Sequence, residues 1–159
     1  MPRPQPKSSS SQSTDEDGLK LSSQLCFATY STAHAFSRVY KPLLDPLGLT
    51  YPQFLVLLVL WEQDNITVKD IGQRLFLNSG TLTPLLKRLQ VAEILQRTRD
   101  AADERQVRVR LTAKGRALKA RAAEARLEVA CATGLPPAEL NALRQQINRL
   151  RQALQAHAG

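Results

Sequence analysis

The chain of 159 residues is long enough for one domain with an apolar core but too short for two large domains. Lys and Arg outnumber Asp and Glu by 22 to 14, and this formal charge of +8 favours an anionic partner, either nucleic acid or a membrane surface. The chain has two cysteines, Cys26 and Cys131, and two histidines, and their spacing does not fit a zinc finger, a disulfide scaffold or a metal site. The sequence also has no Gly-rich phosphate loop and no Ser/His/Asp order typical of a hydrolase. We therefore expect that the protein holds no metal or cofactor and is not an enzyme.

The N-terminal segment divides into a polar tail and a helix. Residues 1–18 are rich in Pro, Ser and Gln and predict a disordered tail, which leaves residues 19–159 as a single domain. A helical pattern follows over Leu19–Leu44, where Pro42 and Pro46 are expected to stop it. The first helix of the domain is therefore predicted to be long.

The next helix is predicted to be buried. Pro52 suits the first turn of a helix, and Phe54–Trp61 is apolar on every side. This run is far shorter than the roughly 20 residues that span a bilayer, and no signal peptide opens the chain. We therefore expect a cytoplasmic protein without a membrane partner.

Two short helices with a tight turn between them predict a helix-turn-helix. Thr67 can cap the first, Val68–Leu75, and either Asn78 or Ser79 can cap the second, about Ser79–Val91. Four leucines share one face of the second helix: Leu82, Leu85, Leu86 and Leu89. The opposite face is basic and rich in hydroxyls, as phosphates and base edges require, and it carries Ser79, Thr81, Pro84, Lys87 and Arg88.

A basic β-hairpin follows the two helices. Ile94–Arg99 and Gln106–Leu111 are predicted strands, and Asp100–Arg105 is the turn between them. The stretch Thr67–Arg116 holds 11 basic and 5 acidic residues, which places +6 of the net +8 there and favours nucleic acid over a membrane. The strand arginines could instead serve only to keep an exposed sheet edge soluble. The order helix, helix, two-stranded wing predicts a winged helix, a mostly α fold with a small β wing.

The C-terminal part is predicted to be helical. Thr112 can cap a long helix that reaches about Thr133, and a last helix runs to about His157 after a break at Gly134–Pro137. Apolar residues of the last helix recur at alternating spacings of three and four, which suits a partner helix: Leu140, Leu143, Ile147, Leu150 and Leu154. We expect two dimerisation segments and one DNA-binding head, over 19–47, 112–157 and 50–111 respectively.

Three strings resemble motifs of the MarR family of winged helix-turn-helix repressors: Asn78–Leu89, Asp103–Val107 and Leu111–Gly115. A second set narrows the resemblance to the OhrR group of organic hydroperoxide sensors: Leu25–Ala28, Tyr30, Tyr40 and Tyr51. The resemblance extends from about Leu19 to the C-terminus. Three positions depart from the pattern, which usually has Asp, Glu and Gly there: Asn78, Gln90 and Glu93.

The resemblance implies a homodimeric repressor of a peroxide-detoxification gene. It would bind double-stranded operator DNA and release it when an organic hydroperoxide, the inducer, oxidises Cys26. Arg105 at the wing tip would enter the minor groove, steadied by Asp103. The second helix of the helix-turn-helix would contact the DNA through residues at its start and on its outer face: Ser79, Gly80, Thr81, Pro84, Lys87 and Arg88.

The resemblance also assigns the chemistry of the thiol site. Cys131 matches the resolving cysteine of the two-cysteine class, which captures the oxidised sulfur of the other subunit as a reversible disulfide. Tyr40 and Tyr51 match tyrosines that reach the sulfur from the opposite subunit. Tyr30, four residues after Cys26, shares its helical face and could line the peroxide pocket.

Elementary chemistry agrees with this assignment in two respects. A cysteine reacts with peroxide as the thiolate, and Ser22 or Ser23 as N-cap would put Cys26 in the first turns of its helix, where the helix dipole favours that form. Tyr40 lies 14 residues beyond Cys26, roughly 21 Å along a continuous helix, so a partner subunit must supply that contact.

Other interpretations are open at the level of the sequence. A lone cysteine is usually a small hydrophobe, and Cys131 could be filler in an Ala-rich helix. Tyr40 and Tyr51 could be ordinary core residues. The chain could be a MarR-type repressor that responds to a small aromatic ligand, with Cys26 as packing. It could also be a thiol peroxidase with two cysteines, although such an enzyme has no need of a basic wing.

Overall fold

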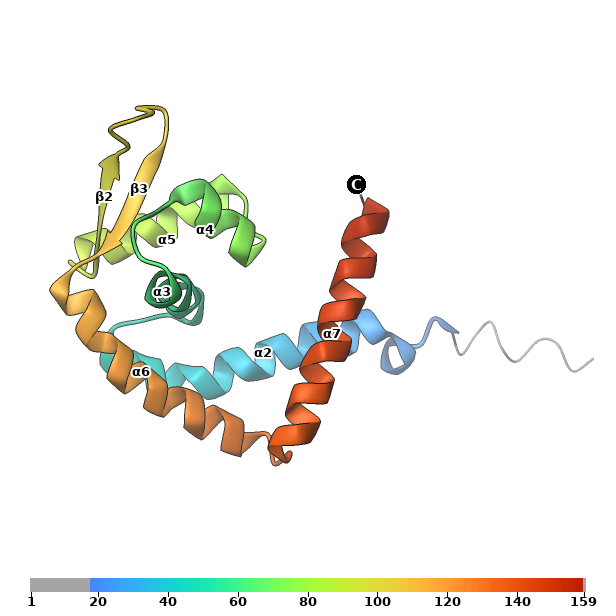
Figure 1. Ribbon diagram of the computed structural model, residues 1–159. Coiled ribbons are helices and arrows are strands. Elements are labelled where there is room, and N and C mark those ends of the chain that lie inside the picture. Colours follow the sequence, from blue (N-terminus) through green and yellow to red (C-terminus); the bar gives the residue numbers. More distant parts are fainter. Residues whose placement is uncertain (1–17, 159) are drawn as a thin grey trace, which may run out of the picture. The chain divides into compact units, whose positions relative to one another are not determined.

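The computed structural model describes residues 18–158, so the tail predicted over residues 1–18 lies, apart from Gly18, outside the described residues. The chain divides into two compact units, with the boundary between Arg38 and Val39. The described part is mostly helical with one small antiparallel sheet (Figure 1), which confirms the predicted fold class.

Helix α2 (Leu25–Leu44) begins six residues later than predicted. Leu21–Ser23 forms a separate 3-10 turn, η1, so neither Ser22 nor Ser23 caps α2 and both expectations are wrong. The Ser23 N–H donates to the Lys20 carbonyl at 3.0 Å and the Gln24 N–H donates to the Leu21 carbonyl at 3.1 Å, and these bonds close the turn ahead of the helix. Cys26 is nevertheless the second residue of α2, within the first turn.

The C-terminal end of α2 also differs from the expectation in one detail. Pro42 lies inside the helix and does not stop it. The helix ends at Leu44 as predicted, and the 3-10 turn η2 (Asp45–Leu47), which contains Pro46, follows it. A proline lacks only its own N–H, so one within the last turn removes a single hydrogen bond and leaves the rest of the helix intact.

Helix α3 (Tyr51–Glu62) is the buried helix that its composition predicts. Its first turn is fixed by a capping box in which Gln53 Oε1 accepts the Thr50 N–H at 2.8 Å. The apolar side chains on several sides of α3 are buried in the core: Phe54, Val56, Leu57, Val59 and Leu60. None of the described helices is alone long and apolar enough to cross a membrane; only the bent pair of residues 25–47 and 51–62 passes by length and composition, and only together.

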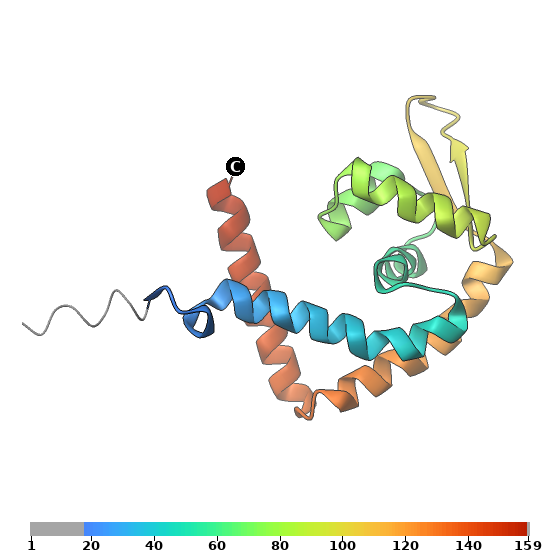
Figure 2. The same cartoon turned by 180° about the vertical axis from the view of Figure 1, so that it is seen from behind.

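The helix-turn-helix is present as predicted, in α4 (Val68–Leu75) and α5 (Ser79–Val91). Thr67 caps α4, because its hydroxyl oxygen accepts the Asp70 N–H at 3.1 Å. Of the two candidate caps of α5, Asn78 is the one used, and its Oδ1 accepts the Thr81 N–H at 2.9 Å. Figures 1 and 2 show both helices lying against α3.

The wing consists of β2 (Leu95–Arg99) and β3 (Val107–Leu111), each beginning one residue later than predicted. The two strands pair antiparallel with Arg97 opposite Val109, and their hairpin extends beyond α5 (Figures 1 and 2). A third strand, β1 (Ile66–Thr67), was not predicted; it pairs with β3, which is the central strand of the sheet. This pairing ties the start of α4 to the wing.

The C-terminal helices are α6 (Ala113–Ala132) and α7 (Pro137–Ala158). Thr112 caps α6 as predicted, with its hydroxyl accepting the Gly115 N–H at 3.1 Å. Gly134, at φ +66°, lies in the break between the two helices. The predicted bounds of both helices are therefore confirmed to within one residue.

Glu93 explains one departure from the family pattern. It follows α5 with φ +59°, a left-handed conformation. The Ile94 N–H donates to the Leu89 carbonyl at 3.0 Å and the Glu93 N–H donates to the Gln90 carbonyl at 3.0 Å, as in a Schellman C-cap. Glycine adopts this conformation without steric cost, so Glu93 maintains the turn at some expense in backbone strain.

Candidate functional site

The outer face of α5 gathers the side chains that the sequence assigns to DNA contact. All of them are exposed: Ser79, Gly80, Thr81, Pro84, Lys87 and Arg88. On the opposite face Leu82, Leu86 and Leu89 are buried in the core. The helix is therefore anchored by its leucines and presents hydroxyls and cations outward, the arrangement that phosphates and base edges require.

The tip of the wing is organised by Asp100, a residue that sequence reasoning missed. Its Oδ1 accepts the Ala102 N–H at 2.8 Å and the Asp103 N–H at 3.3 Å, and its Oδ2 accepts a hydrogen bond from Arg108. The hydrogen bond from Ala102, then that from Arg108, holds the pKa of the Asp100 carboxyl below its usual range. Asp100 is buried and ionised at neutral pH, so the turn carries a fixed internal acceptor.

Asp103 holds Arg105 in the manner that the resemblance implies. Asp103 Oδ1 accepts both the Arg105 N–H and its Nε–H at 3.1 Å, while Gln106 donates to Oδ2 at 3.1 Å. The hydrogen bond from Gln106, followed by that from Arg105, lowers the pKa of Asp103. The Arg105 side chain is 91% exposed, so the ion pair fixes its root while its guanidinium projects from the wing tip.

A hollow of about 450 Å³ lies between the helix-turn-helix and the wing. Three cationic side chains from three elements line it, Lys69 of α4, Arg97 of β2 and Arg105 of the wing tip. The Gln90 amide oxygen accepts the Arg97 Nε–H at 2.6 Å and holds it in place. Lys69 was not among the predicted site residues, because its placement beside the wing depends on the β1–β3 pairing.

In the first unit, the thiol of Cys26 is free and exposed. The Tyr30 ring, one helical turn further along α2, stacks with Phe27 at 6.4 Å between centroids and meets His34 edge-on at 4.4 Å. The spacing of four residues places Tyr30 on the same face of α2 as Cys26. The thiol therefore lies at the start of an exposed aromatic stripe.

In the second unit, the rings of Tyr40 and Tyr51 come together although the two residues are 11 positions apart in the sequence. Their rings stack at 4.9 Å between centroids, and both rings lie against Phe54. Burial raises the pKa of both phenols, so each keeps its proton at neutral pH and can donate a hydrogen bond. Within the described residues neither hydroxyl has a hydrogen-bond partner, which leaves both available to an acceptor outside this unit.

Cys131 is also free and exposed, one residue before the end of α6. It belongs to the second unit, whereas Cys26 belongs to the first. Over residues 18–158, no group of three or more His, Cys, Asp or Glu side chains could hold a metal ion.

The sequence is similar to those of known transcriptional regulators. A model of the SarA/Rot family of transcriptional regulators matches residues 38–122. The regulator TtmR of Methylorubrum extorquens is 52% identical over 96% of this chain and 78% of its own length. The organic hydroperoxide resistance transcriptional regulator of Bacillus subtilis is 48% identical over 68% of this chain and 74% of its own.

Solved structures of the Staphylococcus epidermidis regulator AbfR share the fold. Reduced AbfR bound to DNA has a TM-score of 0.78 and 34% identity, covering 92% of this chain and all of that one. A disulfide form of AbfR has a TM-score of 0.60 and 35% identity over 89% of this chain and 94% of that one. Winged-helix regulators of this kind thus include a protein for which DNA-bound and disulfide states are both known.

Proposed function

Because the chain belongs to the MarR family of DNA-binding transcriptional regulators, in its OhrR group, we propose that it is a homodimeric repressor that releases double-stranded operator DNA when an organic hydroperoxide oxidises Cys26. One observation carries the proposal: an exposed thiol in the first turn of α2, in a chain 48% identical to an organic hydroperoxide resistance regulator.

DNA binding is proposed to use α5 and the wing. The exposed hydroxyls and cations of α5, from Ser79 to Arg88, enter the major groove, and Gly80 lets the backbone approach the DNA closely. Arg105, projecting from the wing tip on its Asp103 support, enters the minor groove. Lys69 and Arg97 line the hollow between these two elements and add positive charge toward the phosphates.

Replacing Arg105 by alanine is expected to weaken operator binding and to lower the slope of log K against log salt by about 1, because one charge near the phosphates is lost. Fluorescence anisotropy of a labelled operator duplex at several salt concentrations measures both quantities. Arg121→Ala is the matched control, since it removes an equal charge from an exposed position of α6. If Arg105→Ala changes neither affinity nor slope, the wing tip is not part of the DNA surface.

Dimerisation is proposed through residues 19–47 and 112–157, which flank the head over residues 50–111. Large apolar side chains of the first unit are exposed in the single chain: Leu21, Leu25, Phe27, Tyr30 and Phe36. Three of the regularly spaced apolar residues of α7 that are predicted to face a partner helix are also exposed: Leu143, Ile147 and Leu154. Two separate apolar surfaces of this kind favour burial against a second copy of the chain.

The proposed chemistry proceeds in two steps. The Cys26 thiolate attacks one oxygen of the hydroperoxide, the O–O bond breaks, and the alkoxide leaves as an alcohol after taking up a proton, so that the sulfur is oxidised to a sulfenic acid. The Cys131 thiol of the other subunit then attacks that sulfur and displaces water to form a disulfide. Tyr40 and Tyr51, protonated and without other partners among the described residues, donate hydrogen bonds to the Cys26 sulfur of the partner.

A non-reducing denaturing gel tests the two steps. Cumene hydroperoxide should convert the wild type to a covalent dimer that a thiol reductant reverses, and neither Cys26→Ser nor Cys131→Ser should form it. A dimer formed by Cys131→Ser would remove Cys131 from the resolving role. Steady consumption of far more than stoichiometric hydroperoxide in the presence of reductant would instead indicate a thiol peroxidase.

A further inference from the structure

The turn between α4 and α5 has an unusual residue at its centre. Phe76 has φ +56°, the left-handed region in which glycine is the usual residue. The Leu77 N–H donates to the Gly72 carbonyl at 2.9 Å, and the Phe76 N–H donates to the Gln73 carbonyl at 3.4 Å, the two bonds of a Schellman C-cap. A bulky aromatic residue in this conformation stores strain that another interaction must offset.

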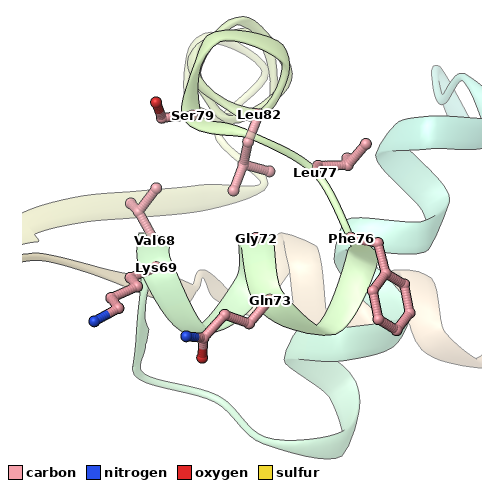
Figure 3. Close-up of a pocket in the computed structure, with 8 residues that line it drawn as sticks. All are labelled: Val68, Lys69, Gly72, Gln73, Phe76, Leu77, Ser79 and Leu82. Carbon is pink, nitrogen blue, oxygen red and sulfur yellow. The ribbon is translucent and has the colours of Figure 1, made fainter. Parts of the chain in front are cut away.

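Core packing does not account for Phe76. The turn itself is tight, because a Cβ atom on Gly72 would lie 2.9 Å from the Leu77 carbonyl oxygen. The Phe76 ring, however, remains 54% exposed at the edge of an open hollow of about 790 Å³. Figure 3 shows the ring directed away from α5, whereas Leu82 points from α5 toward α4. The ring therefore contributes little to the interior of the helix-turn-helix.

Among residues 18–158, the Phe76 ring has one aromatic or cationic partner, and that partner lies on the last helix. The guanidinium carbon of Arg151, on α7, lies 4.2 Å from the centroid of the Phe76 ring. A cation within about 6 Å of an aromatic centroid is attracted by the negative charge of the ring face. Both residues belong to the second unit, so the contact joins two elements of one compact body.

We propose that Arg151 is a positioning residue for operator binding: its guanidinium on the Phe76 ring fixes the α4–α5 turn relative to α7. Ser79, where the DNA-facing side of α5 begins, lies three residues after Phe76. Movement of the turn would therefore change the position of α5. Arg151 itself touches no DNA. The inference rests on the proposed use of α5 for operator binding.

Arg151→Ala tests the inference against Arg149→Ala, a matched control that removes an exposed arginine from the same helix. A cation–π contact at an exposed site is worth about two- to fivefold in an equilibrium constant, so Arg151→Ala should weaken operator binding by about that factor. Arg149→Ala should not, and Arg151→Lys, which keeps a cation, should recover part of the loss. The slope of log K against log salt should stay unchanged in Arg151→Ala, because no phosphate contact is lost.

A double-mutant cycle with Phe76→Leu identifies the contact itself. The double variant should bind the operator as weakly as either single variant, because each one removes the same interaction. Phe76→Gly should weaken binding to the same extent while its thermal midpoint is equal to or above that of the wild type, since glycine relieves the backbone strain. If the ring served only to stabilise the fold, Phe76→Gly would lower both the operator affinity and the thermal midpoint.

Three results would overturn the inference: additive effects in the cycle, a salt slope that falls by about 1 in Arg151→Ala, or unchanged affinity in Arg151→Ala. Additive effects would mean that Arg151 and Phe76 act on binding independently. A lower salt slope would mean that Arg151 contacts a phosphate directly. Unchanged affinity would mean that the contact has no influence on operator binding. Arg105→Ala, run in parallel, reports on the operator surface. If Arg105→Ala weakens binding and Arg151→Ala does not, only the positioning role fails.

Discussion

Replacing Gly115 by alanine is expected to lower the free energy of unfolding by about 3 kcal/mol, because the added Cβ would lie 2.1 Å from the backbone carbonyl oxygen of Ile94. That oxygen cannot move freely, since it accepts the Thr112 N–H at 3.1 Å and the Thr112 hydroxyl at 3.0 Å. The Gly115 carbonyl in turn accepts the Trp61 indole N–H at 3.0 Å. One methyl group would thus disturb the junction of α3, β2, β3 and α6.

Urea unfolding at equal protein concentration measures this effect, and Gly80→Ala is the matched control. Gly80 also lies in the first turn of a helix, but a Cβ there meets only the Asn78 side-chain oxygen at 3.4 Å. Gly80→Ala should therefore be neutral or slightly stabilising, given the higher helix propensity of alanine. Equal stability of the two variants would contradict the close approach of Gly115 to the Ile94 carbonyl.

Cys26→Ser is expected to bind the operator as tightly as the wild type and to lose the response to hydroperoxide altogether. Serine has nearly the same shape, and Cys26 is exposed in the described unit, so the DNA-binding head should be unaffected. Coupling between two sites commonly changes an affinity by about 5- to 150-fold, and all of that change should be absent in the variant. Operator binding before and after cumene hydroperoxide measures the difference.

Two outcomes would contradict the role of Cys26. If Cys26→Ser still releases the operator on hydroperoxide treatment, another group is the sensor. If an aromatic acid releases the operator from the wild type and the variant alike, the chain is a ligand-responsive repressor in which Cys26 only packs. Cys131→Ser is the control, since it retains the first oxidation step and removes only the second cysteine.

Periodicity and capping residues were sufficient to predict most of the fold. The all-round apolar run of α3, the leucine face of α5 and the Thr112 cap each depend on residues within a few positions of one another. The start of α2 was mispredicted because Ser22 and Ser23 fit a helix cap and a 3-10 turn equally well. Strand β1 was missed because two residues carry no periodicity, and Ile66 forms a strand only through β3.

In the candidate site, too, the contacts between residues close in the sequence were predictable and the contacts between distant residues were not. The outward residues of α5 follow from helical spacing, and the pairing of Asp103 with Arg105 is local. Asp100 escaped notice because its partner Arg108 lies on the facing strand. The contact of Tyr40 with Tyr51 depends on how α2 and α3 pack, and that of Phe76 with Arg151 joins residues 75 positions apart, so neither could be read from local pattern.

The central claim, that the oxidation state of Cys26 sets operator affinity, is tested most directly by following both in one sample. The reduced protein on a labelled operator duplex is titrated with cumene hydroperoxide, and each point is divided between fluorescence anisotropy and mass analysis of the peptide that carries Cys26. We predict that the fraction of operator released rises together with the fraction of Cys26 oxidised, and that a thiol reductant returns both fractions to their starting values. Release while Cys26 is still reduced, or full oxidation of Cys26 with the operator still bound, would contradict it.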